Sequence, residues 1–254
     1  MQGGGSDLSD VMKTLGLTHL EKALPALFEQ ARQQKMTYET FLQRALDAEV
    51  EGRNLRAAQR RIQAARLPVT KTLESFEFSF QPSISERLVR ELADLSFIQT
   101  ASNVIVLGPP GVGKTHLCIA LAVKALAAGH SALFTTLSQL AEALETASSP
   151  SLVRQRLRRY TTPGVLIIDE VGSTRLTPEP SHHFFELVTA RYEQGSILLT
   201  SNTSFSEWGN LLGNEVLATA LLDRLLHHAE VLSVTGRSYR MKDRLSANSG
   251  SVKP

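Results

Sequence analysis

The chain has 254 residues, of which 42% are hydrophobic and 20% are charged, and its formal net charge is +2 at pH 7. This composition is typical of one large domain, or of one medium domain with a small accessory, and the small net charge does not by itself indicate a nucleic-acid partner. The single cysteine, Cys118, excludes an intramolecular disulfide and a cysteine-rich metal site and suits a reducing compartment. No apolar run approaches the ~18 residues of a membrane helix, and the N-terminus resembles no signal peptide. We therefore expect a cytoplasmic protein with no membrane partner.

Residues 10–66 carry apolar side chains at helical spacing, with few β-branched residues and Pro25 as the one break. This pattern predicts about three helices. Pro68 then interrupts it and begins a linker. We predict a small all-helical N-terminal domain over residues 1–67, a main domain over 68–243 and a flexible tail over 244–254. The apolar stripes are Leu17, Leu20, Leu24, Leu27 and Phe28, then Phe41, Leu42, Ala45 and Leu46.

From Ser83 onward, helical patterns alternate with short, continuous apolar runs. Strands of this kind, separated by helices, are what a parallel sheet covered on both faces requires. The main domain is therefore predicted to be an α/β fold. The runs are Val104–Leu107, Ala132–Thr135, Val165–Ile168 and Ile197–Thr200.

The stretch "NVIVLGPPGVGKTHL" fits the phosphate-loop pattern G-x-x-x-x-G-K-[ST], between a buried strand and a helix. Its glycines let successive backbone N–H groups converge on phosphate oxygens, and the helix N-terminus adds favourable dipole charge. Lys114 is expected to bridge the β- and γ-phosphates of ATP and Thr115 to ligate Mg²⁺. Cys118, on the following helix, is expected to be a core residue. The predicted nucleotide-binding residues here are Gly108, Pro109, Pro110, Gly111, Val112, Gly113, Lys114, Thr115 and His116.

Two further strands end in polar residues. "GVLIIDEVG" places Asp169 and Glu170 at the carboxyl edge of the sheet, the same edge as the phosphate loop. Asp169 would support Mg²⁺ together with Thr115, and Glu170 would polarise the attacking water. Asn202 follows "ILLTS" and would reach the same edge. By itself, an asparagine at a strand end is usually only a turn residue.

At this point the chain resembles an AAA+ ATPase, and more narrowly the IstB family of helper ATPases of insertion-sequence transposition, relatives of the helicase loader DnaC. The resemblance rests on "LPVTKTLESFEF", "GPPGVGKTHL", "LIIDEVG", "RYEQGSILLTSN", "FSEWGNLLGN", "ATALLDRLLHHAEVL" and "GRSYRMKD", in order from about residue 67 to residue 243. It implies ATP and Mg²⁺ as cofactors, a transposase as partner, and a role for Asn202 in orienting the lytic water. The chain departs from the family after Gly172, where Ser173–Thr174–Arg175 replace the usual Tyr-Leu-Pro.

The resemblance also gives two arginines a role. Arg224 lies in the apolar helical pattern of "LLDRLLHHAEVL", Leu221–Leu232, and matches the arginine that AAA+ proteins supply to the nucleotide site of a neighbouring subunit. Its alternative is a surface group beside Asp223 or Glu230. Arg240 matches the second sensor arginine, which contacts nucleotide in cis, and Arg237 is a weaker candidate. Because only 14 residues follow Arg240, we expect no C-terminal lid domain.

Four histidines are interpreted as structural or surface groups, since no further metal ligands stand at suitable spacing along the chain. They are His182, His183, His227 and His228.

Two arginine clusters are candidates for contacts with DNA phosphates. "GRNLRAAQRRIQAAR" holds five arginines in 15 residues with no acid, and "VRQRLRRY" holds four. The alternatives are a solvated helix face or a surface that docks acidic residues of a neighbouring subunit. Neither cluster carries a base-reading motif, so the binding should be largely independent of DNA sequence. The candidates are Arg53, Arg56, Arg60 and Arg61 in the first cluster and Arg154, Arg156, Arg158 and Arg159 in the second.

Together these features predict an ATP-dependent helper that oligomerises on duplex DNA, hydrolyses ATP and delivers target DNA to a transposase. The alternative is a helicase loader of the DnaC type, which acts on single-stranded DNA. A small-molecule P-loop kinase is a third class, and it would need no arginine from a neighbouring subunit.

Overall fold

The computed structural model describes residues 5–147 and 149–241. The chain divides into two compact units, residues 1–60 and 61–254, and helix α3 (Tyr38–Ala65) runs across the division. The domain limits of 1–67 and 68–243 stay a prediction, and the expected tail, 244–254, lies outside the described residues. Within those residues, no helix combines the length and the apolar character needed to cross a membrane.

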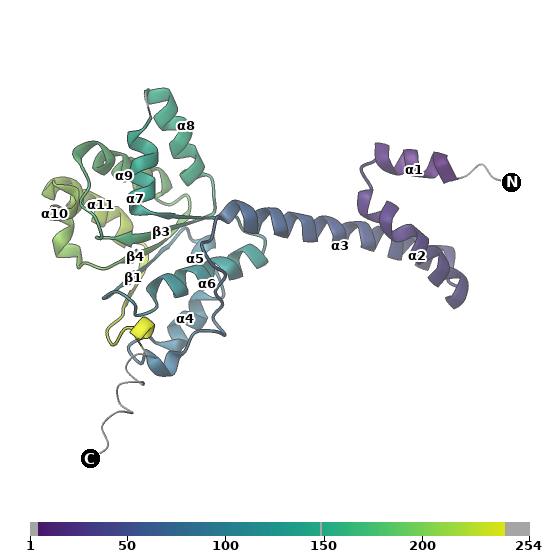
Figure 1. Cartoon of the computed structure of the whole chain (residues 1–254), viewed down its shortest axis with the longest axis horizontal. Helices are drawn as coiled ribbons and strands as arrows, with labels where there is room; N and C mark the ends of the chain where they lie inside the picture. The colour runs from purple at the N-terminus through teal and green to yellow at the C-terminus, as the bar shows by residue number, and fades with distance from the viewer. Residues whose placement is uncertain (1–4, 148, 242–254) are drawn as a thin grey trace, which may run out of the picture. The chain divides into compact units, whose positions relative to one another are not determined.

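The first unit is helical, as its apolar periodicity predicts. It contains α1 (Gly5–Thr14), α2 (Thr18–Gln34) and most of α3 (Figure 1). Its core is small, because several stripe side chains, including Phe28, Leu42 and Leu46, remain exposed. The buried members are Met12, Leu20, Leu24 and Ala45.

A buried carboxylate joins two of these helices. Glu49 on α3 accepts hydrogen bonds from the backbone N–H groups of His19 and Leu20, each at 2.8 Å, in the first turn of α2. Arg53 pairs with the same carboxylate at 2.7 Å. Burial acts to raise the pKa of Glu49, but the hydrogen bonds from Arg53, Leu20 and His19 bring it below its ordinary value. Glu49 therefore caps α2 from a neighbouring helix.

The second unit is a five-stranded, all-parallel sheet in the order β2-β3-β4-β1-β5. The four predicted apolar runs are four of its strands, each extended by one to three residues. The strands are β1 (Asn103–Leu107), β2 (Ala132–Thr136), β3 (Val165–Val171), β4 (Ser196–Ser201) and β5 (Ala229–Ser233).

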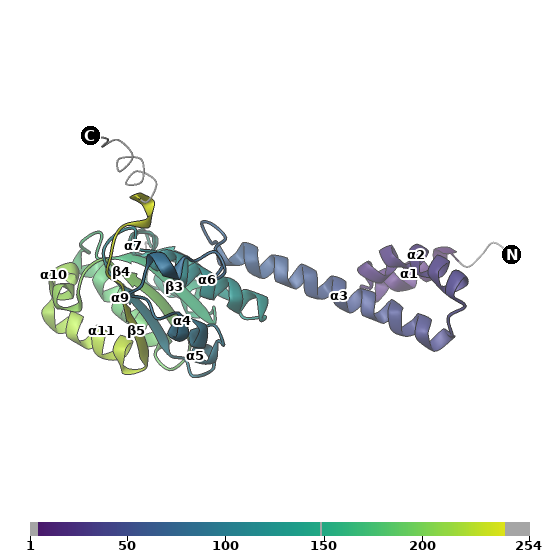
Figure 2. The ribbon, with the colours of Figure 1, turned by 90° about the horizontal axis from the view of Figure 1, so that it is seen from below.

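Helices cover both faces of this sheet (Figures 1 and 2). Alternate residues of β1 face opposite sides: Val104 and Val106 pack in one core and Ile105 in the other. The first core also contains side chains of α4 (Glu86–Leu92), α5 (Ser96–Gln99) and α6 (Lys114–Ala127), including Cys118, which is buried as expected. The second contains side chains of α7 (Leu137–Glu145), α8 (Pro150–Thr161), α9 (Pro178–Arg191), α10 (Trp208–Leu212) and α11 (Glu215–His227). The short 3₁₀ turns are η1 (Phe78–Phe80), η2 (Phe205–Glu207) and η3 (Tyr239–Met241).

The fifth strand corrects one interpretation of the sequence. The helical pattern of Leu221–Leu232 holds only as far as His227, and the chain then enters β5. Asn103 stabilises this change of structure, because its side chain donates to the Leu225 carbonyl at 2.9 Å and its backbone N–H donates to the His228 carbonyl at 2.7 Å. These contacts join residues more than a hundred positions apart, so local periodicity does not reveal them.

Candidate nucleotide-binding site

The phosphate loop runs from β1 into α6, and its glycines meet close neighbours. Gly111 has φ +84°, and a Cβ there would lie 2.1 Å from the Ser238 Oγ. Gly113 has φ +102°, and a Cβ there would lie 2.8 Å from Cε2 of Phe76. Both positions therefore need a residue without a side chain, for the left-handed backbone and for the close approach.

Lys114 is buried at the start of α6, with only 6% of its surface exposed. Its ammonium donates to the carbonyls of Gly108 (2.7 Å) and Pro109 (2.8 Å) and to the Asn202 side-chain oxygen (2.7 Å). Burial lowers the pKa of Lys114, while Asp169 acts to raise it and Arg240 acts to lower it. Since the three acceptors are neutral, an anionic phosphate oxygen would be a better partner for this cation than any of them.

Thr115 and Asp169 meet as the sequence predicts. The Thr115 hydroxyl donates to both carboxylate oxygens of Asp169, at 2.9 and 3.1 Å, and the Thr200 hydroxyl donates to Oδ1 at 2.5 Å. Asp169 is buried, with 4% of its surface exposed. Hydroxyl and carboxylate oxygens are hard ligands that suit Mg²⁺, so the pair fits the ion that the sequence implies.

Glu170 is exposed beside this pair, in a strained backbone conformation with φ +61°. The β3–β4 register shifts between Ile168 and Val171, and the Glu170 N–H donates to the Thr200 hydroxyl at 3.0 Å instead of to the strand ladder. Positive φ is uncommon for a residue with a side chain and tends to occur at functional sites. The irregularity directs the chain so that Asp169 is buried and Glu170 faces solvent.

Asn202 connects the phosphate loop to the acidic strand end. Its oxygen accepts from Lys114, and its amide donates to the Ser173 hydroxyl at 3.2 Å. Ser173 belongs to the segment in which the chain departs from the family pattern. The departure therefore lies next to the predicted site and provides a contact within it.

A cavity of about 320 Å³ opens beside the loop. Arg240 and His116, both predicted nucleotide-binding residues, line it. Burial lowers the pKa of His116, whose Nε2 lies 2.9 Å from the Thr72 carbonyl oxygen. Arg237, the weaker candidate, is not among the lining residues, and its backbone carbonyl accepts a hydrogen bond from the Gln81 side-chain amide at 2.9 Å. The lining residues are Val69, Lys71, Ser75, Phe76, Glu77, Gln81, Gly111, Val112, Gly113, Lys114, Thr115, His116, Ile119, Tyr239 and Arg240.

The segment expected to be a linker supplies part of that wall. Phe76 is buried against Gly113, and its ring makes an edge contact with His116 at 5.2 Å between centroids. The sequence by itself predicts no site role for this segment. Its inclusion among the family-like stretches was the one signal available.

Arg224 lies on α11, as predicted, and does not line this cavity. It is partly buried: its guanidinium donates to the Ala220 carbonyl at 2.9 Å and lies 4.9 Å from the ring centroid of Phe185 on α9. Its predicted role at the nucleotide site of a neighbouring subunit stays a prediction.

The four arginines of the basic cluster on α8 differ in their contacts. Arg156 donates to the Ala143 carbonyl and, at 2.6 Å, to the Thr146 hydroxyl, so it fixes the end of α7. Arg154, Arg158 and Arg159 are exposed.

The cluster on α3 also has internal partners. Arg53 pairs with Glu49 and donates to the Gly16 carbonyl at 3.1 Å, while Arg56 donates to the Thr18 hydroxyl at 3.3 Å. Arg60 is exposed and Arg61 is partly buried.

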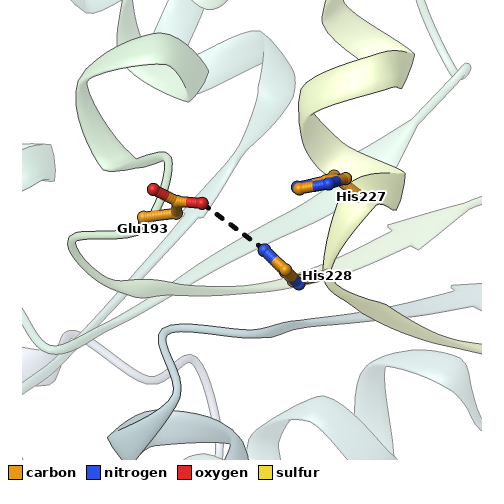
Figure 3. A group of neighbouring side chains, drawn as sticks. All are labelled: Glu193, His227 and His228. Carbon is orange, nitrogen blue, oxygen red and sulfur yellow. Dashed lines mark ion pairs between the residues drawn. The ribbon is translucent and has the colours of Figure 1, made fainter.

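The histidines are distributed over two sites. His182 and His183 lie near Glu186 on α9, at 3.5 and 3.2 Å. His227 and His228 lie beside Glu193, which comes from the turn after α9 (Figure 3). Glu193 is 34 positions before His227, so spacing along the chain gave no sign of this group.

The parallel sheet, the phosphate loop and the acidic strand end define a P-loop ATP-binding protein of the AAA+ class. The model of the family described as IstB-like ATP binding protein matches residues 10–247, and the chain belongs to this family. It is 46% identical over 241 residues to the ATP-binding protein of insertion sequence IS21 from Pseudomonas aeruginosa, covering 95% of this chain and 91% of the relative. It is 43% identical over 219 residues to that of IS5376 from Geobacillus stearothermophilus, covering 86% and 87%.

Solved structures share the fold. DnaI superimposes with a TM-score of 0.54 and 19% identity, over 69% of this chain and 92% of DnaI. AMPPCP-bound DnaA from Aquifex aeolicus gives 0.52 and 19%, over 72% of this chain and 56% of DnaA. At these identities the likeness confirms the predicted AAA+ core and nothing finer. The expected absence of a C-terminal lid concerns residues beyond Met241, outside the described part of the chain.

Proposed function

We propose that the chain is an ATPase that assists insertion-sequence transposition as an oligomer, in which Arg224 of one copy completes the nucleotide site of the next. Lys114, the Thr115–Asp169 pair and Glu170 lie at one edge of the sheet, whereas Arg224 does not line the cavity beside them. This separation is the observation that carries the proposal. The family and the insertion-sequence relatives support the biological role.

In the proposed reaction, the phosphate loop and Lys114 hold the β- and γ-phosphates. Thr115 and Asp169 would hold Mg²⁺, which would supply positive charge beside the phosphates. Glu170 polarises the attacking water, and Asn202 orients that water. Arg240 contacts the nucleotide within the same chain. Arg224 of the neighbouring copy stabilises the charge of the transition state, an effect of ~10³–10⁵ in other nucleotidases.

We further propose that the oligomer binds duplex DNA largely independently of sequence and delivers it to the transposase of the same element. The exposed residues Arg154 and Arg158, one helical turn apart on α8, are the favoured phosphate contacts. Arg53 and Arg56 are less favoured, because both already contact other residues of the N-terminal unit.

The first test measures the ATPase rate per subunit against protein concentration, with and without duplex DNA. We expect the rate to rise with concentration and with duplex, and to fall ~10³-fold or more in Arg224→Ala. Arg87→Ala is the matched control, because Arg87 is an exposed arginine paired with Glu91 at 3.0 Å on α4. A rate that is flat with concentration and unchanged in Arg224→Ala would indicate a self-contained nucleotidase.

Mixing two inactive variants shows which copy supplies the arginine. Lys114→Ala retains Arg224 but lacks a working phosphate site, and Arg224→Ala has the reverse defect. If the arginine acts between copies, the mixture recovers part of the activity. If it acts within one copy, no mixture recovers any.

A second test separates the transposition helper from the helicase loader. The helper should bind duplex more tightly than single-stranded DNA, and the loader should show the opposite preference. Replacing both Arg154 and Arg158 by alanine should weaken binding to all sequences and reduce the slope of log K against log salt by about 2. The same double change at Arg87 and Arg90, which pair with Glu91 and Glu86 on α4, should leave that slope unchanged.

A further inference from the structure

Three potential metal ligands meet at the amino-terminal ends of the strands, opposite the edge that carries Asp169. Glu193 follows α9, His227 ends α11 and His228 precedes β5 (Figure 3). One ligand atom from each lies within 4.8 Å of the other two, and all three residues are exposed. In the described ranges, 5–147 and 149–241, no other group of three histidine, cysteine or acidic side chains meets this spacing.

The closest pair has the separation that a shared zinc ion needs. The His228 Nε2 and the Glu193 Oε1 are 3.4 Å apart. Two ligands at ~2.0–2.2 Å from one zinc, with a tetrahedral angle between them, are separated by roughly 3.3–3.5 Å. The third ligand is an imidazole nitrogen of the exposed His227, which lies within 4.8 Å of the ligand atoms of the other two residues.

A second contact orients the His227 ring. Its Nδ1 lies 2.7 Å from the Tyr192 hydroxyl oxygen. When Nδ1 carries the proton and donates it to Tyr192, Nε2 presents its lone pair to a metal. A metal-binding histidine usually has a hydrogen bond of this kind at its other nitrogen, because the bond fixes the tautomer and the ring orientation.

The backbone around the group is also held in place. The His228 carbonyl accepts from the Asn103 N–H at 2.7 Å. Glu193 has φ +56°, and the next two N–H groups, of Gln194 and Gly195, both donate to the Arg191 carbonyl at 2.9 and 3.1 Å. The ligands therefore come from two segments that do not need to fold on binding.

We propose that Glu193, His227 and His228 bind one Zn²⁺ ion, with water completing the coordination. Two imidazoles and one carboxylate suit zinc and similar transition ions rather than Mg²⁺, which prefers an all-oxygen site. The ion ties the α9–β4 turn to the end of α11, three residues after Arg224. It is separate from the Thr115–Asp169 pair at the other ends of the strands.

The test uses the full-length protein without nucleotide or Mg²⁺. Zn²⁺ is titrated in competition with a chromophoric chelator, and the visible absorption of Co²⁺ reports the coordination geometry. We expect one ion per chain and a tetrahedral Co²⁺ spectrum. His228→Gln and Glu193→Gln should each weaken Zn²⁺ binding by about tenfold or more.

His182→Gln is the matched control, because it removes an exposed histidine that faces Glu186 at 3.5 Å but belongs to no group of three. Its Zn²⁺ affinity should equal that of the wild type. Zn²⁺ should also raise the unfolding temperature of the wild type and of this control, but not that of His228→Gln, because only a bound ion stabilises the folded chain.

Three results would overturn the proposal. The first is a wild-type chain that binds less than one ion. The second is equal binding by wild type, His228→Gln and Glu193→Gln. The third is a site that is lost in Thr115→Ala but kept in His228→Gln, which would place the ion at the nucleotide site.

Discussion

Among the described residues of the second unit, two lysine or arginine side chains, Lys114 and Arg191, are buried, one at each end of the strands, and they differ in what surrounds them. Lys114, 6% exposed, donates to two loop carbonyls and to Asn202. Arg191, 1% exposed, donates to five backbone carbonyls, those of Tyr160, Thr161, Pro163, Gly164 and Ser196. Both charges are removed from water, which is costly without partners.

The difference lies in whether the partners can be replaced. The acceptors of Arg191 belong to the end of α8, the loop after it and the start of β4, so the guanidinium joins these segments permanently. Burial lowers the pKa of Arg191 to about 10, which keeps it charged at neutral pH. Lys114 lies next to the cavity, where an incoming phosphate can take the place of its neutral acceptors. A buried cation therefore indicates a ligand site only when its partners are exchangeable.

The largest expected effect is on stability at Arg191. Arg191→Met removes all five hydrogen bonds that the guanidinium donates to backbone carbonyls and should lower the free energy of unfolding by about 4 kcal/mol. Urea unfolding followed by circular dichroism measures it, with Arg87→Met as the exposed control. If Arg191→Met lowered the free energy of unfolding less than Arg87→Met does, water would replace the guanidinium without cost. Arg191 would then not be the structural cation that we contrast with Lys114.

Lys114→Met should have the opposite effect: a large loss of ATP hydrolysis with little change in stability. ATP hydrolysis should fall by about 10²–10³-fold, because a charge that stabilises the transition state is lost. The free energy of unfolding without nucleotide should change little, because burying the charge of Lys114 is itself costly. The exposed Lys124, on the same helix α6, gives the control Lys124→Met. A large loss of stability in Lys114→Met with normal hydrolysis would show that Lys114 has a structural role, like Arg191, and no role in the reaction.

Asn202→Ala should have a smaller effect on the same reaction. It removes one of the three acceptors of Lys114 and the contact to Ser173, so hydrolysis should fall about tenfold, the order of one hydrogen bond to a charged group. Steady-state kinetics measure the loss, and Asn210→Ala, an exposed change on α10, is the control. Equal rates for the two variants would remove Asn202 from the proposed site.

The smallest effect is expected at Gly195. A Cβ there would lie 2.7 Å from the Arg191 Nη2, so Gly195→Ala should push the guanidinium off its carbonyls and lower the free energy of unfolding by about 1 kcal/mol. Gly164→Ala is a close control, because its Cβ would meet the Ser131 carbonyl oxygen at an ordinary 3.5 Å. Hydrolysis should be unchanged in both. Equal stability of the two variants would show that Arg191 has room to move.

Local patterns were sufficient for the phosphate loop and for four strands. The loop depends on consecutive residues, whose glycines and Lys114 take their roles from neighbours a few positions away. The runs around Val104, Ala132, Val165 and Ile197 are continuous and apolar because both faces of the sheet are covered. The meeting of Thr115 with Asp169 also followed from the order of elements, since the carboxyl ends of parallel strands share one edge.

Other features depended on contacts between distant residues. Asn103 ends α11 and aligns β5, Phe76 closes the cavity wall, and Glu193 joins His227 and His228. No local motif marks Arg191, and only the fold brings five backbone carbonyls around its guanidinium. Periodicity and motifs report which neighbours a residue has along the chain. Tertiary packing brings together segments that share no local pattern. It therefore determines which groups surround a buried charge and which side chains can share a metal ion.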